Sequence, residues 1–501
     1  RSRRRGPPLT RRTGDLLDPR AVLALLAALT VARLAVNAWL DPLPLSGDEA
    51  QYWLYGEHLA GGYYSKPPLL PWLMRLSTDL FGPSHWAMRL PSVVLHVAIA
   101  AALAGLARVL FDRATAVVTA LLYLTLPAVS VSSMLASTDP PMMLAWALAS
   151  LALVAALTTG GLGWWALAGA ALGYGLLGKY TAVAWLAGAG LVLLLDPYWR
   201  RGVSGRGIAV ALAAALIVLA PNLVWNAANG FPTVTHVGEN AGLGGAAPPV
   251  AERLAELGDF LVSQAGVFGP IPFVVLLWLL VRPATWRDPA LRFVLVLGLP
   301  LLAAIAAQAY LNGANANWAA PVYLGFTVAV AAWLVAGARR RLTAATVGLH
   351  LVVFALVVGS AALHRTPSAY SAGLDPFRKL RGVDVVAAAV APVLADHPEA
   401  RLLMTDRMLM ANVLEATGWP LERAILWNPD RVANNHWELV TAFPPEPDGA
   451  YVVVIRGERA PALLDRFAAH APLTVERIET HRDRGFTLQI HLARDFAGYR
   501  R

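Results

Sequence analysis

Two carboxylates and two lysines stand at predicted helix ends between long apolar runs, and their residue types could carry chemistry. The carboxylates are Asp48 and Asp139, and the lysines are Lys66 and Lys179. An ionised carboxylate can act as a general base or hold a sugar hydroxyl. A lysine can bind a phosphate as a point charge. These four residues therefore indicate base catalysis or hydroxyl binding beside a phosphate site.

Asp48 has a structural alternative, which is shared by its neighbour Glu49. Ser46 and Glu49 have the spacing of a capping box, which predicts a helix that begins at residue 47 and ends at Gly61-Gly62. The apolar and tyrosine side chains of this helix predict that it lies in the membrane interface. Asp48 then occupies the first turn, where the helix dipole favours the ionised carboxylate. Either residue is a catalytic candidate, or merely completes the helix end.

Both lysines are presented at helix junctions. Lys66 precedes Pro67-Pro68, which excludes helical geometry at residue 66. Lys179 lies in the sequence GLLGKYTAV, on the predicted outer side. A lysine is unusual there, because Lys and Arg are enriched in the cytoplasmic loops of membrane proteins. Lysine is also rare, since only three of the 41 Lys and Arg residues are lysines. Phosphate binding is the functional interpretation, and snorkelling toward lipid headgroups is the alternative.

Further polar residues are weaker candidates. Asp139 precedes a proline and could simply be a helix N-cap. Arg33 lies inside the first apolar run, where it could stabilise phosphate or fix helix packing, and His96 is better explained by packing. Asn317 and Trp318 precede another helix and suit recognition of a sugar or headgroup, although an interfacial tryptophan is also an ordinary membrane anchor.

The composition predicts that these residues are positioned by membrane helices. The 501-residue chain is 57% hydrophobic and 15% charged, whereas an ordinary soluble domain has about 25% charged residues. The net charge of +9 is dispersed and forms no tract suited to nucleic acid. No cysteine is present, which excludes disulfides and thiolate metal sites. Dinucleotide-binding, Walker, zinc-protease and serine-hydrolase motifs are also missing from the sequence, so we expect no nucleotide-driven transport and no proteolysis.

We predict eleven transmembrane helices, each formed by an apolar run of suitable length. The runs lie near 21–40, 91–110, 114–130, 141–158, 164–178, 180–195, 208–225, 268–282, 293–311, 320–337 and 343–363.

The arginines predict the orientation of these helices. The N-terminal segment and every second connection are rich in arginine, which predicts a cytoplasmic N-terminus and a retained first helix. The tail then lies outside, in the periplasm of a bacterium whose inner membrane holds the protein. Long outer loops are expected at 41–90 and 226–267.

The tail has a different composition from the apolar part. Helical patterns at 383–396, 407–416 and 461–470 alternate with β-like runs at 402–405, 451–455 and 486–492. We therefore expect an all-α integral-membrane domain over 1–364, and a soluble α/β domain over 365–501.

Four motifs together give the chain a family resemblance. It resembles the bacterial GT-C glycosyltransferases, a group similar to protein O-mannosyltransferases and to the aminoarabinose and galacturonic-acid transferases that modify lipid A. The match runs in order through about residues 1–330. The motifs are the acidic pair Asp48-Glu49, Lys66-Pro67-Pro68, Thr138-Asp139-Pro140 and Gly178-Lys179-Tyr180.

The resemblance implies an inverting transfer of a sugar from a polyprenyl-phosphate donor to a lipid, glycan or protein acceptor at the outer membrane face. It assigns Asp48 as the base or acceptor-orienting group, with Glu49 and Asp139 as further catalytic candidates. Lys66 and Lys179 would stabilise the departing lipid phosphate. The remaining substrate-binding candidates are Tyr64, Tyr180, Arg33, Asn317 and Trp318.

No cofactor is predicted. The aminoarabinose enzyme has a glutamate directly before the motif lysine, implicated in a metal contact, where this chain has Ser65. We therefore predict no metal. Two other classes of function stay open on the sequence: a secondary transporter or lipid flippase, in which ionisable groups gather near the bilayer midplane, and a membrane scaffold whose outer domain binds partners.

Overall fold

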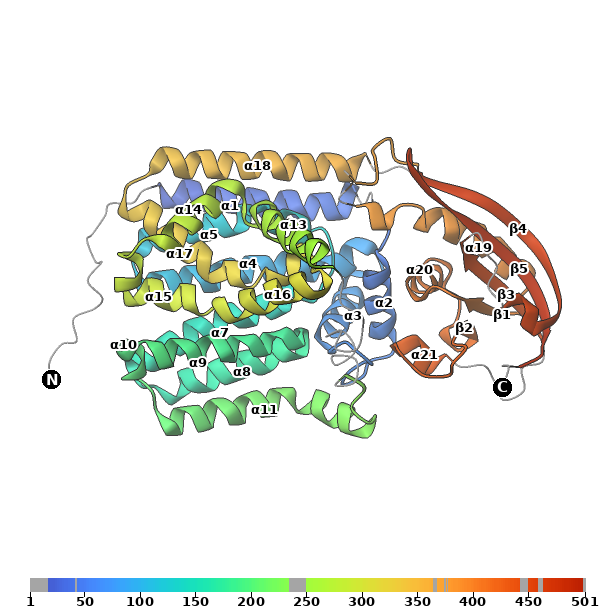
Figure 1. Ribbon diagram of the computed structural model, residues 1–501, viewed down its shortest axis with the longest axis horizontal. Coiled ribbons are helices and arrows are strands. Elements are labelled where there is room, and N and C mark those ends of the chain that lie inside the picture. Colours follow the sequence, from blue (N-terminus) through green and yellow to red (C-terminus); the bar gives the residue numbers. More distant parts are fainter. Residues whose placement is uncertain are drawn as a thin grey trace.

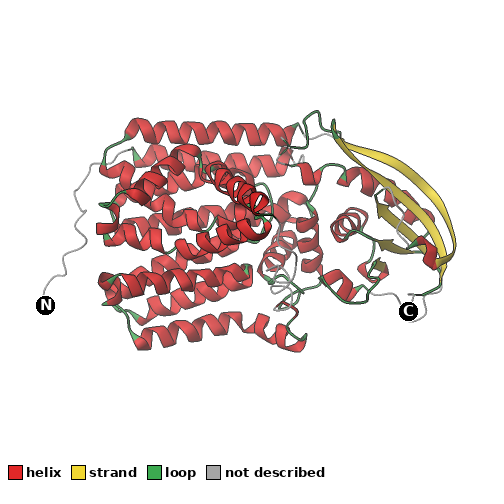
Figure 2. Ribbon diagram, viewed as in Figure 1, coloured by secondary structure: helices red, strands yellow, loops and turns green. Residues whose placement is uncertain are grey.

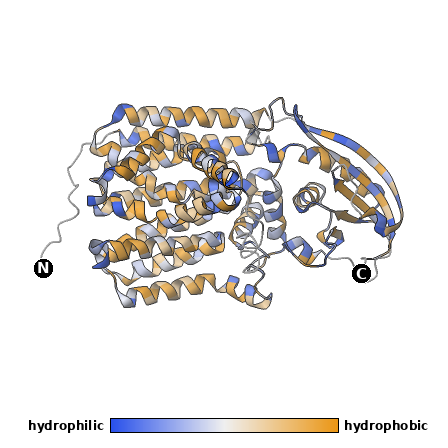
Figure 3. Cartoon of the chain, viewed as in Figure 1, coloured by the Kyte–Doolittle hydropathy of each residue, from blue (hydrophilic) through white to orange (hydrophobic). Residues whose placement is uncertain are grey.

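The computed structural model describes residues 17–40, 43–233, 249–363, 367–373, 375, 377–441, 449–457 and 463–498. Helices run roughly parallel through the larger part of the molecule, and a curved sheet with its own helices lies at one end (Figures 1 and 2). Apolar residues dominate the bundle helices along most of their length (Figure 3). The chain therefore divides into a helical membrane-type part and an α/β part, as its composition predicts.

The bundle contains six described helices that are long and apolar enough to cross a membrane, or up to seven if α13 and α14, bent by 113°, form one span. Four shorter apolar helices occupy predicted spans that fall below this length. The helices of the bundle are α1 (Pro19–Ala35), α4 (His85–Leu110), α5 (Arg113–Thr125), α6 (Pro127–Ser132), α7 (Asp139–Thr159), α8 (Leu162–Gly178), α9 (Ala184–Leu195), α10 (Pro197–Arg200), α11 (Gly205–Ala228), α13 (Val250–Phe268), α14 (Pro270–Val281), α15 (Pro289–Val296), α16 (Leu299–Asn312), α17 (Val322–Ala336) and α18 (Arg340–Ala362).

The second half of the expected outer loop at 226–267 forms helix α13. This helix carries Glu252, Arg253, Glu256 and Asp259, so it lacks a continuous apolar run. Its buried side chains Phe260, Gln264 and Phe268 recur every four residues on one face. Residues 234–248 of that expected loop lie outside the described part of the chain.

The first outer loop folds into α2 (Gly47–Glu57) and α3 (Leu69–Phe81). The predicted capping box is present, because Ser46 and Glu49 bond each other's backbone amides. The predicted end at Gly61-Gly62 is wrong: the hydroxyl of Tyr63 donates to the Tyr55 carbonyl at 2.6 Å and terminates the helix earlier. The two glycines instead permit close approach of α11, since a Cβ on Gly61 would lie 2.4 Å from the Pro221 carbonyl oxygen.

The tail folds into a five-stranded mixed sheet of order β2-β1-β3-β5-β4, in which β1 runs parallel to β2 and β3 while β5 is antiparallel to β3 and β4. The strands are β1 (Arg401–Met404), β2 (Ala424–Leu426), β3 (Ala450–Arg456), β4 (Phe467–His481) and β5 (Arg484–Phe496), and the helices are α19 (Val383–Asp396), α20 (Arg407–Thr417) and α21 (His436–Val440).

The helix expected at 461–470 is wrong. Leu464–Arg466 form a single 3-10 turn, and β4 begins at Phe467. Residues 461 and 462 lie outside the described part of the chain. Alanines at 468, 469 and 471 favour a helix locally, but pairing with β5 along most of β4 satisfies the backbone instead. Tertiary pairing therefore overrides local propensity here.

Helix α2 joins the two parts of the molecule. It packs against α3 on the bundle side and against α20 of the tail (Figure 1). The apolar side chains of α2 share one buried cluster with those of α19, α20 and the sheet. A Cβ on Gly47 would lie only 2.5 Å from the Cβ of Met408, so α20 closely approaches the start of α2. The α/β part therefore covers much of the apolar side of α2 that the sequence assigned to the membrane interface.

Candidate active site

A large cavity lies where the bundle meets the tail. Its volume is about 950 Å³, and it extends from α2 to the starts of α7 and α17 and to the segment before α19. Three of the predicted residues line it: Asp48, Asp139 and Asn317. A cavity of this size is suited to a substrate-sized ligand. The structure thus brings both candidate carboxylates to one open space.

Asp48 is exposed to this cavity from the first turn of α2. Lys66 lies nearby, with its Nζ 5.8 Å from the centroid of the Tyr52 ring. The pKa of Lys66 is raised because Tyr52 and Asp48 favour the ammonium form more strongly than partial burial disfavours it. The Asp48 region therefore combines an accessible carboxylate with a lysine that keeps its positive charge.

Asp139 is held differently, by two partners from distant parts of the chain. Lys179 Nζ lies 2.6 Å from Asp139 Oδ1. Asn317 Nδ2 donates to Asp139 Oδ2 at 2.8 Å. Asp139 begins α7, Lys179 follows the last residue of α8, and Asn317 lies in a 3-10 turn before α17. One carboxylate thus joins three helix junctions.

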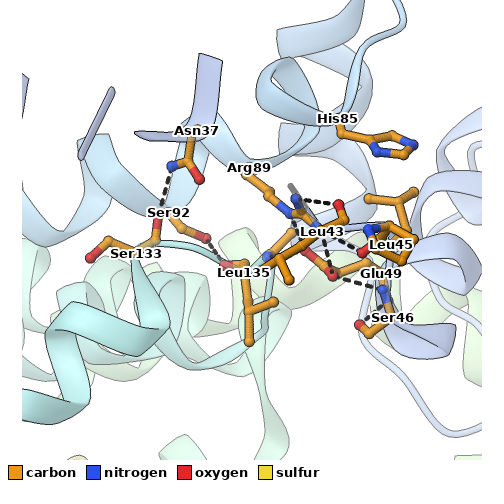
Figure 4. Close-up of polar contacts among 12 residues, drawn as sticks. Asn37, Leu43, Leu45, Ser46, Glu49, His85, Arg89, Ser92, Ser133 and Leu135 are labelled. Atoms are coloured by element: carbon orange, nitrogen blue, oxygen red, sulfur yellow. Dashed lines mark hydrogen bonds and ion pairs between the residues drawn. The ribbon is translucent and has the colours of Figure 1, made fainter. Parts of the chain in front are cut away.

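Glu49 faces away from the cavity although it follows Asp48 directly. Its side chain is fully buried and paired with Arg89, whose Nε lies 2.9 Å from Glu49 Oε1 (Figure 4). Arg89 also donates to the carbonyls of Leu43 and Pro44 at 3.0 and 2.9 Å. The amide of Ala136 donates to Glu49 Oε1 at 2.8 Å.

This buried ion pair connects the two carboxylate regions. Glu49 lies on the helix that carries Asp48, and Ala136 lies three residues before Asp139. Burial alone raises the pKa of Glu49, but Arg89 and the amides of Ser46 and Ala136 together hold it below its usual value. Arg89 was not among the predicted site residues, although an arginine in an outer loop is as unusual as the outer lysines.

Four other residues named from the sequence, Arg33, Tyr64, His96 and Tyr180, contact the surrounding protein. Arg33 is buried, donates to the Leu124 carbonyl at 2.5 Å and lies 5.5 Å from the Phe354 ring centroid. His96 bonds Tyr123 at 2.9 Å and Ser132 at 3.0 Å, consistent with the predicted packing role, and lines the cavity wall. The hydroxyl of Tyr180 donates to Asn222, and Tyr64 is buried.

Six further predicted residues lie outside the set of described residues that line the cavity: Arg33, Tyr64, Lys66, Lys179, Tyr180 and Trp318. Trp318 is 37% exposed in the same turn as Asn317. The structure therefore does not place these six residues in the wall of the open space shared by the carboxylates, although Lys179 contacts Asp139, which lines it.

Two cations of the tail line the cavity and were not predicted. These are Arg378 and Lys379, in a 3-10 turn before α19. In the sequence they follow the last membrane helix by many residues, so no local pattern indicates that they return to the membrane part. Over the described ranges, no three His, Asp or Glu side chains gather in a way that could hold a metal ion.

The family model and the two curated relatives that match this chain are all glycosyltransferases. Residues 65–225 match the family model for dolichyl-phosphate-mannose-protein mannosyltransferases. The lipid A galacturonosyltransferase RgtD of Rhizobium johnstonii is 32% identical over 328 residues, which are 64% of this chain and 66% of RgtD. The lipopolysaccharide core galacturonosyltransferase RgtB of the same organism is 26% identical over 447 residues, covering 84% of this chain and 87% of RgtB.

A solved structure extends the likeness to the whole fold. ArnT from Cupriavidus metallidurans, in its crystal structure bound to undecaprenyl phosphate, superposes with a TM-score of 0.59. The match covers 94% of this chain and 98% of ArnT at 17% sequence identity. The bundle and the tail therefore both belong to an architecture already seen in ArnT.

Proposed function

Since the chain belongs to the GT-C membrane glycosyltransferases that resemble protein O-mannosyltransferases and lipid A galacturonosyltransferases, we propose that it transfers a sugar from a polyprenyl-phosphate donor to an acceptor of the bacterial cell envelope. The observation that carries the proposal is the cavity of about 950 Å³ in which the exposed Asp48 and the Asp139 network face one space. RgtD makes galacturonic acid the first sugar to test and lipid A the first acceptor.

Asp48 is the proposed general base. It accepts the proton of the acceptor hydroxyl while that oxygen attacks the anomeric carbon of the sugar. The bond between the anomeric carbon and the phosphate oxygen breaks, and its electron pair leaves with the polyprenyl phosphate. Attack from the side opposite the leaving group inverts the anomeric centre. The exposure of Asp48 in the cavity supports this role, because a base must reach the hydroxyl.

Lys66 and Lys179 are the proposed partners of the lipid phosphate, where negative charge develops as the bond breaks. The raised pKa of Lys66 keeps its ammonium charged at neutral pH. Lys179 is oriented by Asp139, which Asn317 holds from its other side. We therefore assign Asp139 and Asn317 as positioning residues, and Glu49 as a buried support for Asp48 in place of the catalytic role considered from the sequence. The mechanism needs no metal.

We further propose that the site opens toward the periplasm of the bacterial inner membrane. Helix α10, which ends at Arg200, and the start of α18 at Arg340 lie at the end of the bundle away from the tail (Figure 1). Retention of arginine on the cytoplasmic side then supports a cytoplasmic N-terminus, with the cavity and tail outside.

The test uses the full chain purified into lipid nanodiscs. Undecaprenyl-phosphate galacturonic acid and lipid A are added, and the lipids are analysed by mass spectrometry. We expect lipid A to gain one hexuronosyl unit as an equal amount of undecaprenyl phosphate appears. Movement of intact donor across a proteoliposome bilayer without any covalent product would instead support a flippase or transporter.

A further inference from the structure

Arg378 and Lys379 form a basic turn that faces the candidate active site from the tail. Both side chains are exposed, and both line the cavity that Asp48 and Asp139 share. The turn spans Arg378–Leu380 and lies between the last bundle helix and α19. It therefore brings two cations to the cavity from a part of the chain separate from Lys66 and Lys179.

The turn is held in place from both sides. Its apolar residues Phe377 and Leu380 are buried together with Val36, Leu43 and Met134 of the membrane part. Just before the turn, Asp375 accepts a hydrogen bond from the Phe377 amide at 2.8 Å.

Two residues of the tail complete this anchor. Asp375 Oδ2 lies 2.6 Å from Arg381 Nε and 3.3 Å from His481 Nε2, and all three side chains are buried. Burial opposes ionisation of Asp375, but hydrogen bonds from Arg381, the Phe377 amide and His481 bring its pKa below the usual value. The basic turn is thus a fixed feature of the cavity wall.

The charges around the cavity are unequally compensated. Asp139 is paired with Lys179, and Asp375 with Arg381. The side chains of Arg378 and Lys379, by contrast, have no hydrogen bond or ion pair to any residue in the described part of the chain. An arginine fork beside a lysine is a suitable partner for an oxyanion. The turn therefore offers two positive charges to a ligand.

We propose that Arg378 and Lys379 bind the carboxylate of a uronic-acid sugar on the lipid-linked donor. The inference rests on the proposed function for the presence of that donor. A uronosyl phosphate has two anionic groups, the phosphate on C1 and the carboxylate on C5, at either side of the ring oxygen. The phosphate would be bound by Lys66 and Lys179, as the proposed function has it, and the carboxylate would be bound by the basic turn. The turn would thereby select uronic acids over neutral hexoses.

The test compares two donors that differ only at C6 of the sugar. The full chain in nanodiscs receives undecaprenyl-phosphate galacturonic acid or undecaprenyl-phosphate galactose, with lipid A as acceptor, and kcat/KM is measured for each. We expect the wild type to prefer the uronosyl donor by about tenfold or more, as lost charge-assisted hydrogen bonds would imply. In the R378Q/K379Q variant this preference should disappear, mainly through a higher KM for the uronosyl donor.

Two further variants sharpen the test. R378K/K379R keeps both charges and should retain most of the preference. R477Q removes an exposed arginine from β4 and should match the wild type with both donors. Equal losses of R378Q/K379Q on both donors, or a wild type without preference, would overturn the inference. So would a loss that vanishes when dephosphorylated lipid A replaces lipid A, because the cations would then serve the acceptor.

A binding measurement separates this inference from the proposed function. Native mass spectrometry compares binding of the two donors to the wild type and to R378Q/K379Q without an acceptor. Selective uronosyl binding that the variant loses supports the inference even if no sugar is transferred, in which case the proposed function alone fails. Equal binding of both donors by the wild type contradicts the inference whether or not transfer occurs.

Discussion

The Asp48 and Asp139 regions line one cavity, yet their carboxylates are in opposite situations. Asp139 already has its partners, with Lys179 at 2.6 Å and Asn317 at 2.8 Å. Asp48 is exposed, and its neighbour Lys66 lies over the Tyr52 ring. A carboxylate that is held by two protein groups is suited to orient them, whereas an accessible carboxylate can take a proton from a substrate. The difference assigns chemistry to Asp48 and positioning to Asp139.

Asp48→Asn tests the different roles of the two carboxylates most directly, and we expect it to have the largest effect on transfer. Asparagine keeps the shape of the side chain but cannot act as a base, so transfer should fall by about 10²- to 10⁴-fold. Because Asp48 is exposed, the thermal unfolding temperature should stay near that of the wild type. The control is Asp79→Asn, which changes an exposed carboxylate on α3 and should leave transfer within about twofold. Substantial activity in Asp48→Asn would show that a group other than Asp48 acts as the general base.

Substitution of the neighbouring carboxylate, Glu49, should lower the stability of the fold and leave transfer largely intact. Glu49→Gln leaves Arg89 buried without its counter-charge, which should lower the free energy of unfolding by about 3 kcal/mol. Thermal unfolding in nanodiscs measures this loss. Transfer per folded molecule should change by less than about tenfold, since Glu49 lies away from the cavity. A stable but inactive Glu49→Gln would contradict the division of roles.

The pH dependence of unfolding follows from the same residue. The pKa of Glu49 is lower in the folded than in the unfolded chain, so its contribution is present above the unfolded value. That contribution is lost as the pH falls through the lowered folded value. The Glu49→Gln variant should therefore lose less stability on acidification than the wild type, whereas an unchanged acid profile would show that Glu49 is not ionised in the folded protein.

The Asp139 region should behave as a coupled pair with a smaller effect. Asp139→Asn and Lys179→Met should each reduce transfer by on the order of 10- to 100-fold, because either change misplaces the other charge. The double variant should transfer sugar at least as fast as the less active of the two single variants, as expected for residues that act together. Losses that multiply in the double variant would indicate that Asp139 acts on the substrate independently of Lys179.

The smallest effect is expected where the tail covers the Asp48 region. His436 packs against the rings of Tyr55 and Tyr63, and burial lowers its pKa to about 4. The unfolded chain therefore binds more protons between about pH 6.5 and 4. Stability should fall by about 1 kcal/mol from pH 7 to 5.5 for this reason. His436→Phe should remove that decrease, and His397→Gln should not; parallel curves for all three proteins would exclude His436 as its source.

Much of the fold was accessible from the sequence because apolar runs of membrane length are a strong signal. All eleven predicted runs contain apolar helix. Helix α13 is not among the predictions, because charged residues interrupt its apolar run. The capping box and the start of α2 were also predicted, since they depend on local spacing. The end of that helix was not, because it depends on the Tyr63 hydroxyl folding back onto the Tyr55 carbonyl.

The sequence allowed several residues of the site to be predicted, but it did not show which of them contact one another. Asp48, Asp139, Lys66 and Lys179 stood out as charges at helix junctions, yet nothing local indicates that Lys179 and Asn317 converge on Asp139. The same holds for the basic turn at Arg378, which reaches the cavity through contacts between the tail and the membrane part. Such pairings arise from tertiary packing, which a single sequence does not reveal.

The most direct measurement is a cryo-electron microscopy structure of Asp48→Asn in nanodiscs with an intact undecaprenyl-phosphate sugar, trapped because the base is missing. We expect the phosphate to lie beside Lys66 and Lys179, with the side of the anomeric carbon opposite the phosphate facing the residue at position 48. A phosphate bound elsewhere, or a sugar whose open side faces away from that residue, would contradict this expectation.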